Sequence, residues 1–200
     1  MVRQGGQGQV GEYSVRRAGI DDVEGARSLM LDTFYREMGT GYVPAFHADV
    51  IDLERTYLRT PGQALFVAEL GGEVVATGGV RSGGPKSPPN PLWLAEHYAR
   101  GATAQLVRTY VRPAHRRRGL ARALVDLCCE FAADTGYDTA YLHTNPEIDG
   151  AEPFWRSLAK EVLDERPGGE PVVHFEIPLL PVSANEAVVA EAVPLQRPRP

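Results

Sequence analysis

Two apolar runs joined by a pair of glycines mark the first half of the chain. Residues 64–70 (ALFVAEL) and 73–80 (EVVATGGV) are rich in apolar and β-branched residues, and only Gly71-Gly72 lies between them. Glycine adopts the positive φ angles that a two-residue hairpin turn requires, so this arrangement is typical of a β-hairpin. The pattern predicts two antiparallel strands here.

Strand-like and helix-like patterns alternate in the second half of the chain. Residues 104–111 (AQLVRTYV) and 139–144 (TAYLHT) each have the composition of a strand. Between them, apolar side chains recur at helical spacing up to Thr135-Gly136, where the helix should end; they are Leu120, Leu124, Leu127 and Phe131. The order strand, helix, strand predicts one βαβ unit with a right-handed crossover.

The connection that enters this helix has the composition of an anion site. It contains four arginines before Gly119-Leu120-Ala121, and a fifth, Arg122, follows directly. The first N–H groups of a helix have no intrahelical acceptor and carry partial positive charge, so phosphate oxygens bind there. Glycine also lets a phosphate approach the backbone closely. We predict a phosphate-binding loop; the alternative is a solvated basic patch at a helix start.

The charge of the whole chain makes the arginine cluster more informative. The formal net charge is −5, whereas a nucleic-acid-binding protein usually carries a broad positive face. A basic cluster on an acidic protein indicates a local anionic ligand. Coenzyme A, with its diphosphate and ribose phosphate, fits this description.

The spacing Arg116-x-x-Gly119-x-Ala121 resembles the Arg/Gln-x-x-Gly-x-Gly/Ala pyrophosphate loop of the GNAT superfamily, the acyl-coenzyme-A-dependent N-acetyltransferases. Residues 13–22 are similar to the opening strand and first helix of that family, and the glycine hairpin to its second and third strands. The resemblance implies a single mixed α/β (α+β) domain over residues 12–180. Its central, mostly antiparallel sheet should have about six or seven strands flanked by helices.

The resemblance also implies acetyl-CoA as co-substrate and no metal. It assigns the phosphates to the arginine forks and to the N–H groups of the loop, and the pantetheine arm to the region of Asn145 and of Ala151-x-x-Phe154-Trp155. The implied coenzyme-binding residues are Val111, Arg112, Arg116, Arg117, Arg118, Gly119, Leu120, Ala121, Arg122, Asn145, Phe154 and Trp155.

Catalysis in the family implies a backbone N–H of the fourth strand that polarises the thioester carbonyl. In this chain that donor falls at Tyr110 or Val111. Many members place a tyrosine acid where this chain has Trp155, and indole is no useful acid. Tyr110 or Tyr141 can substitute, or the thiolate, with a pKa of about 8.5, leaves without an acid.

No single residue is marked as the general base or as the acceptor site. The base candidates are Glu96, His97, His143, Glu147, Asp149 and Glu152. Aromatic area for the acceptor is expected from Phe34, Tyr35, Tyr42, Phe46, His47, Trp93 and Tyr98, with carboxylates at Glu37 and Asp49 to attract a cationic amine. We interpret residues 81–103, whose first half is dense in Pro and Gly, as a substrate-side flap; the alternative is a tolerated surface insertion.

These features predict an N-acetyltransferase that moves an acetyl group from acetyl-CoA to a primary amine of a small molecule or peptide, by direct attack in a ternary complex. The alternatives are a non-catalytic acyl-CoA-binding or interaction module and a basic-loop nucleic-acid binder. We expect no nucleic-acid or membrane partner and a cytoplasmic protein, and the sequence leaves a homodimer open. The adjacent Cys128 and Cys129 exclude a disulfide framework. Residues 1–11 and 181–200 are predicted to be flexible.

Overall fold

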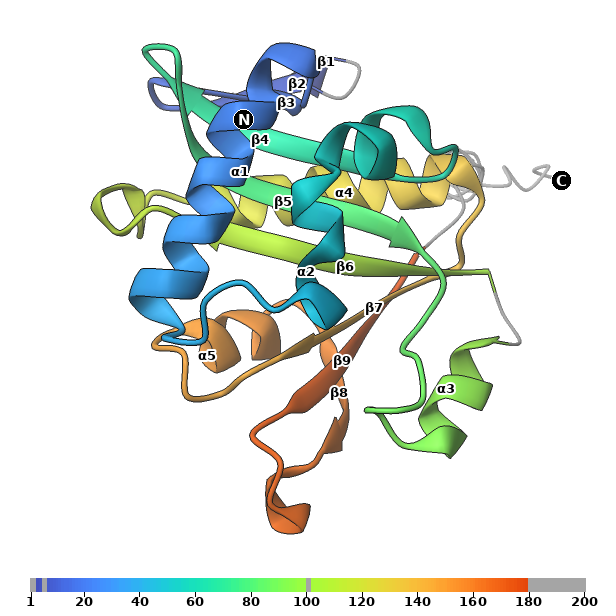
Figure 1. Ribbon diagram of the computed structural model, residues 1–200. Coiled ribbons are helices and arrows are strands. Elements are labelled where there is room, and N and C mark those ends of the chain that lie inside the picture. The colour runs from blue at the N-terminus through green and yellow to red at the C-terminus, as the bar shows by residue number, and fades with distance from the viewer. Residues whose placement is uncertain (1–2, 5–6, 100–101, 180–200) are drawn as a thin grey trace, which may run out of the picture.

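A mixed sheet with helices on both faces forms the core of the molecule (Figure 1). The computed structural model describes residues 3–4, 7–99 and 102–179. In that part of the chain the sheet has nine strands in the order β1-β2-β3-β4-β5-β6-β7-β9-β8. The strands are β1 (Arg3–Gln4), β2 (Gln7–Val10), β3 (Tyr13–Arg17), β4 (Ala64–Leu70), β5 (Glu73–Ser82), β6 (Thr103–Val111), β7 (Thr139–Thr144), β8 (Lys160–Asp164) and β9 (Val173–Pro178).

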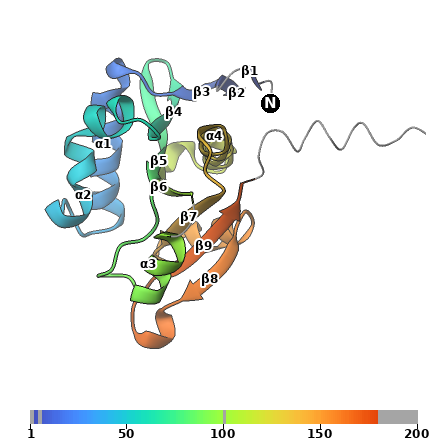
Figure 2. The ribbon, with the colours of Figure 1, turned by 90° about the vertical axis from the view of Figure 1, so that its right-hand side faces the viewer.

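Helices cover the two faces of the sheet in separate layers (Figure 2). One layer holds α1 (Val23–Asp32) and α2 (Pro44–Ile51), and α4 (Leu120–Thr135) lies on the opposite face. The remaining helices are α3 (Leu92–Ala99) and α5 (Ala151–Arg156), with shorter turns at η1 (Ile20–Asp22), η2 (Thr33–Glu37), η3 (Glu54–Arg59), η4 (Pro113–His115) and η5 (Arg166–Gly168). In the described residues, no helix combines the length and apolar character that a membrane span needs.

Two apolar clusters follow from this layering. Leu120, Leu124 and Leu127 of α4 are buried with Trp155 in the larger cluster. Phe34 is buried with Leu29, Met30 and other residues of the α1–α2 face in the second. Because side chains alternate along a strand, the sheet supplies apolar residues to both clusters.

The local predictions of the sequence are confirmed. The strands β4 and β5 pair antiparallel around Gly71 and Gly72, whose φ angles are +60° and +86°. The strands β6 and β7, which precede and follow α4 along the sequence, pair in parallel in the sheet. The helix α4 ends at Thr135, and its C-cap Gly136 has a φ of +95°. The mixed, mostly antiparallel sheet flanked by helices also agrees with the expected architecture.

The N-terminal boundary differs from the prediction. Residues 1–11 were expected to be flexible, but Gln7–Val10 form β2, which pairs antiparallel with β3 and brings Val10 against the main core. With β1, this strand raises the count from about six or seven to nine. A four-residue strand with two glutamines and a glycine has no apolar alternation to reveal it. The predicted flexible residues 181–200 lie outside the described part of the chain.

Residues 81–103 contain one element that the sequence anticipated. The segment LWLAEHYA forms α3, which buries Leu94 and Tyr98 against Tyr141 of β7. The segment is therefore anchored on the sheet face that carries Tyr141. Its role as a substrate flap stays a prediction.

Candidate functional site

The strands β6 and β7 separate in the middle of the sheet. Their parallel pairing covers only Thr103↔Thr139, Ala104↔Ala140 and Gln105↔Tyr141. Beyond these pairs, β6 continues to Val111 along β5, and β7 continues to Thr144 along β9. Figure 1 shows the two strands diverging towards α5 and the loop before α4. The divergence leaves backbone groups of β6 without a neighbouring strand on one side.

The predicted phosphate loop lies at the open end of this divergence. Gly119 is the N-cap of α4 with φ +83°, and Arg117 also has a positive φ of +62°. The backbone N–H of Ala123 donates to the Gly119 carbonyl at 3.1 Å, so the helix proper begins immediately after the glycine. The first N–H groups of α4 therefore face the loop, as an anion site requires.

The arginines of the loop are held by acidic residues from other elements. Arg116 pairs with Glu37 of η2 and donates from Nε to the carbonyl of Val111 at 3.1 Å. Arg112 contacts Asp32 at 2.9 Å and Glu73 at 3.1 Å. The remaining pairs are Arg118 with Glu12 at 3.5 Å and Arg122 with Asp126 at 3.1 Å. Among the described residues, Arg117 is the member of this group for which no ion pair is found.

A bulge interrupts the pairing of β5 and β6. Thr77 pairs with Tyr110 and Gly79 with Val107, so Arg108 and Thr109 together face the single residue Gly78. Arg108 adopts φ +55°, a conformation that costs a residue with a Cβ atom about 1–2 kcal/mol. The Thr77 hydroxyl donates to the Arg108 carbonyl at 2.8 Å and supports this conformation.

A buried ion pair anchors the bulge to α2. Arg108 donates to both carboxylate oxygens of Asp49, at 2.6 and 3.0 Å, and the Tyr57 hydroxyl donates to the same carboxylate at 2.5 Å. Burial opposes the charge of Asp49, but the hydrogen bonds and positive charge of Arg108 outweigh it and hold the pKa of Asp49 below its usual value. Burial also raises the pKa of Tyr57, so its hydroxyl stays protonated.

The ion pairs of Asp49 and Glu37 bear on their expected role of attracting a cationic amine. The charge of Asp49 is already compensated by Arg108, and that of Glu37 by Arg116. While these ion pairs are in place, neither is a free carboxylate for a cationic amine. Sequence alone misses both pairs because their partners are distant along the chain.

The backbone N–H groups of successive residues in β6 point to opposite sides of the strand, and this distinguishes the two candidate donors, Tyr110 and Val111. The N–H of Arg112 donates to the Val75 carbonyl at 2.9 Å, so it points to β5. Tyr110 lies two residues earlier and points its N–H the same way, whereas the N–H of Val111 points to the opposite, unpaired side. The Val111 carbonyl accepts a hydrogen bond from Arg116 and, like the Val111 N–H, points away from β5.

Aromatic groups gather near the bulge on the α1–α2 face. Phe34 stacks on His47 with ring centroids 3.9 Å apart and contacts Tyr110 edge-on at 6.0 Å. Tyr42 approaches His47 at 6.0 Å. The other predicted acceptor aromatics divide into exposed side chains, namely Tyr35, Phe46 and Trp93, and the buried Tyr98, which packs on β7.

The residues expected beside the pantetheine arm have structural contacts of their own. Trp155 is only 7% exposed and belongs to the main core, with Phe154 edge-on to it at 4.9 Å. The Asn145 side chain accepts the backbone N–H of Glu147 at 2.8 Å and so closes a local turn. The position of Trp155 agrees with a packing role.

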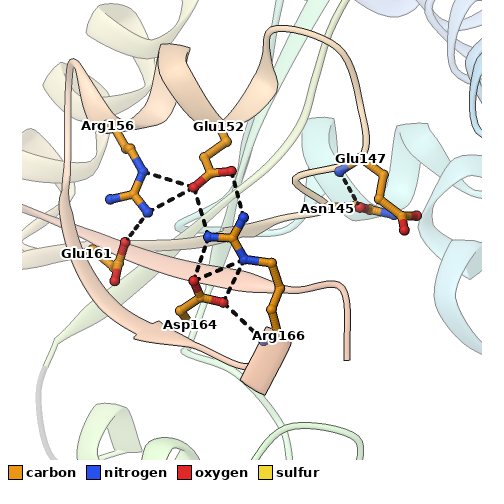
Figure 3. A network of polar contacts seen from close by, with 7 residues as sticks. All are labelled: Asn145, Glu147, Glu152, Arg156, Glu161, Asp164 and Arg166. Carbon is orange, nitrogen blue, oxygen red and sulfur yellow. Dashed lines mark hydrogen bonds and ion pairs between the residues drawn. The ribbon is translucent and has the colours of Figure 1, made fainter. Parts of the chain in front are cut away.

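Most of the base candidates have exposed or ion-paired positions. Glu96, His97, Glu147 and Asp149 lie on the surface. Glu152 belongs to an ion cluster with Arg156 and Arg166, which also contact Glu161 and Asp164 (Figure 3). The hydrogen bonds from Arg156, together with the charges of both arginines and the hydrogen bonds from Arg166, lower the pKa of Glu152, and desolvation opposes them.

His143 differs from the other candidates because it lies on the β7 segment that diverges from β6. It is accessible to solvent but lies among strands, and desolvation, His174 and Arg108 together lower its pKa to about 4 against the opposing charge of Glu165. The imidazole is therefore neutral near pH 7. Its neighbours His174 and Glu165 carry no local sequence signal and were not predicted.

Known proteins resemble this chain in sequence and in fold. The sequence profile described as Acetyltransferase (GNAT) family matches residues 28–159. N-acetyltransferase 8 of Rattus norvegicus is 34% identical over 119 residues, which are 60% of this chain and 49% of that protein. Human N-acetylaspartate synthetase is 29% identical over 114 residues, 57% of this chain and 33% of that protein. The chain thus spans about half the length of the first of these curated relatives and a third of the second.

Solved structures extend the likeness of fold to most of the chain. A GNAT-family acetyltransferase from Staphylococcus aureus Mu50 has a TM-score of 0.64 at 15% identity, covering 84% of this chain and 99% of that chain. PaiA N-acetyltransferase from Thermoplasma acidophilum, solved in complex with coenzyme A, has a TM-score of 0.57 at 11% identity, covering 83% and 98%. FeeM, an N-acyl amino acid synthase from uncultured soil microbes, has a TM-score of 0.59 at 19% identity, covering 84% and 92%. With the profile match across well over half of its residues, the chain belongs to the GNAT acetyltransferase family.

Proposed function

We propose that this protein transfers an acetyl group from acetyl-CoA to a primary amine of a small molecule or peptide, by direct attack of the amine in a ternary complex. One observation carries the proposal: the N-terminus of α4, capped by Gly119, lies at the open end of the β6–β7 divergence. Acetyl-CoA would supply an activated acetyl thioester: the amine nitrogen forms a C–N bond to the acetyl carbon and gives one proton to a base, and the C–S bond breaks to release coenzyme A as its thiolate.

The loop residues fit a diphosphate in charge and in backbone geometry. Arg117 and the first N–H groups of α4 would hold phosphate oxygens. Arg116, which is 42% exposed, would exchange Glu37 for a phosphate oxygen. Arg112 is tied to Asp32 and Glu73, so its contribution would be to position the loop and to add positive charge.

The Val111 N–H is the better placed of the two predicted donors for the acyl carbonyl. Its direction towards the unpaired side of β6 follows from the hydrogen bond of Arg112, whereas that of Tyr110 is directed to β5. A backbone donor fixed by a sheet needs no reorganisation as charge develops on the carbonyl oxygen.

His143 is the base that the arrangement supports best. It lies on the diverging segment of β7, is accessible to solvent, and is neutral near pH 7 because its pKa is about 4. A neutral imidazole nitrogen can accept the proton that the amine loses.

The names of two matched proteins guide the choice of acceptors. N-acetylaspartate synthetase and N-acyl amino acid synthase both refer to N-acylated amino acids. A panel of free amino acids is therefore the starting set, followed by peptides with free N-termini and by polyamines.

Two measurements test the proposal. Titration calorimetry with acetyl-CoA measures binding at the loop, and thiol release across the amine panel measures transfer. Binding with thiol release that requires an amine supports the proposal. Binding without release from any amine favours the non-catalytic acyl-CoA-binding module, and no binding contradicts the phosphate-loop assignment.

A further inference from the structure

A buried hydrogen-bonded chain leads from the surface to His143. Glu165 Oε1 lies 2.6 Å from His174 Nε2, and His174 Nδ1 lies 2.7 Å from the Tyr141 hydroxyl. The same hydroxyl lies 3.5 Å from His143 Nδ1, the longest link. We propose that Glu165, His174 and Tyr141 are positioning residues that set the tautomer of His143 and take up the charge when His143 accepts a proton.

The strand register brings these groups to one face of the sheet. The strands β7 and β9 are antiparallel, with Tyr141 opposite Glu176 and His143 opposite His174. Directly opposed residues share a face, so the two histidines and the tyrosine lie together. Tyr98 of α3 covers Tyr141 at a ring distance of 4.9 Å and donates to Glu176 instead.

Burial separates the middle of the chain from its two ends. Tyr141 and His174 are both 0% exposed, whereas the Glu165 side chain is 20% exposed and His143 is accessible to solvent. Two buried polar side chains in series need complementary donors and acceptors at every link. The residues at the two ends of this hydrogen-bonded series, Glu165 and His143, therefore determine which group donates and which accepts at each link.

Those protons can be assigned from the carboxylate. An ionised Glu165 only accepts, so His174 must donate from Nε2. The Nδ1 atom of neutral His174 is then an acceptor and takes the single hydroxyl proton of Tyr141. The Tyr141 oxygen is left to accept from His143 Nδ1–H, so the lone pair of His143 is at Nε2.

This assignment gives each residue a part in the proposed transfer, and the inference rests on that proposed function. The attacking amine gives one proton to His143 Nε2. His143 Nδ1 can pass its own proton to the Tyr141 oxygen as Tyr141 passes its proton to His174 Nδ1. One proton enters at His143 and one positive charge ends on His174, next to the Glu165 carboxylate.

The charged surroundings of His143 favour moving this charge. His143 faces Arg108 from β6 and His174 from β9, which disfavour an imidazolium at its position, while Glu165, after β8, is the negative group. Asp164 and Arg166 flank Glu165, and their ion cluster with Glu152 of α5 holds this loop in place (Figure 3). Charge on His174 would be compensated directly by Glu165 at 2.6 Å.

The first test measures the tautomer of His143 in ligand-free protein by ¹⁵N NMR, with His143→Gln to assign its signals. We expect Nδ1–H in the wild type and a shift towards Nε2–H in Tyr141→Phe, which removes only the hydroxyl. Tyr98→Phe is the matched control, since it also removes a tyrosine hydroxyl on the same face, but one that donates to the Glu176 carboxylate and not to a histidine. An unchanged tautomer in Tyr141→Phe, or an equal change in Tyr98→Phe, would overturn the proposal.

The second test measures turnover and does not depend on the buried substitution. Glu165→Gln keeps the shape of the partly exposed side chain but removes its charge, and we expect kcat to fall about tenfold or more, within the contribution of a positioned base. The KM for acetyl-CoA should not change. A kcat within twofold of the wild type would overturn the charge-uptake role. If no amine is acetylated at all, the proposed function fails, while the NMR result still decides the tautomer.

Discussion

At the scale of single residues, the contact between Arg116 and Glu37 has opposite expected effects when each partner is replaced. Arg116→Ala removes a charged hydrogen-bond donor worth about 1.5–3 kcal/mol, so acetyl-CoA affinity should fall about ten- to a hundredfold. Glu37→Gln removes the competing carboxylate, and affinity should be equal to the wild type or higher. Calorimetry measures both. Equal weakening by the two variants would mean that the pair supports only the fold.

Replacing Trp155 tests whether this residue takes part in catalysis at the position where many members of the family have a tyrosine acid. Its indole is 7% exposed within the main core, so Trp155→Phe should cost on the order of 1–2 kcal/mol of unfolding free energy through lost packing. The pH dependence of turnover between pH 6 and 9 should keep its shape, because indole has no proton to give in this range. A collapse of turnover with intact acetyl-CoA affinity would instead assign the indole a direct part in catalysis.

The contacts that sequence reasoning missed are those between residues that are remote along the chain. Arg108 and Asp49 are 59 positions apart, and Tyr141 and His174 are 33 apart. No periodicity or motif connects such pairs, since only the register of the folded sheet brings them together. The loop arginines and Gly119 were predicted because their signal is contained in one short segment.

At the scale of elements, the Arg108–Asp49 ion pair joins α2 to the bulge in β6. The two side chains are only 12% and 5% exposed, so Asp49→Asn leaves a buried guanidinium without its counter-charge. We expect a loss of about 3–5 kcal/mol in urea unfolding. Glu24→Gln is the control, because it breaks an ion pair whose carboxylate is 87% exposed and should cost about 1 kcal/mol or less.

The pH dependence of the same pair has a definite sign. The pKa of Asp49 is lower in the folded state than in the unfolded chain, where it is about 3.9. Its contribution to stability is complete above that value and is lost as the pH falls through the folded-state pKa. The wild type should therefore lose more stability below pH 4 than Asp49→Asn does. Parallel curves would show that Asp49 is not charged in the folded protein.

The elements differ in how well the sequence encodes them. The hairpin at Gly71-Gly72 and the helix between Leu120 and Thr135 carry their own turn and periodicity signals, and both were predicted. The strand β2 was not, because its few mixed residues become a strand only when the edge of β3 is available to pair with them. Tertiary pairing decides such short segments.

At the scale of the whole molecule, ligand binding should stabilise the fold. The phosphate loop contacts four other elements through its ion pairs and hydrogen bonds: Arg112 contacts α1 and β5, Arg116 contacts η2, and His115 bonds to Tyr13 of β3 at 3.0 Å. A ligand that binds only the folded state at about 100 times its Kd adds about 2.7 kcal/mol. For a chain of this size, that corresponds to a Tm increase of about 5–11 °C.

The matched variants for this measurement are two substitutions of Gly119. Its φ of +83° makes any side chain strained, so Gly119→Ala and Gly119→Glu should each lose roughly 1–2 kcal/mol of unfolding free energy, and both should lower the Tm of the free protein. Only the glutamate adds negative charge at the phosphate site. We therefore expect acetyl-CoA to raise the Tm of the wild type, to raise that of Gly119→Ala less, and to leave Gly119→Glu unchanged, whereas an oligonucleotide should shift none of them. An equal shift in all three proteins would place acetyl-CoA away from the N-terminus of α4 and contradict the site argued here.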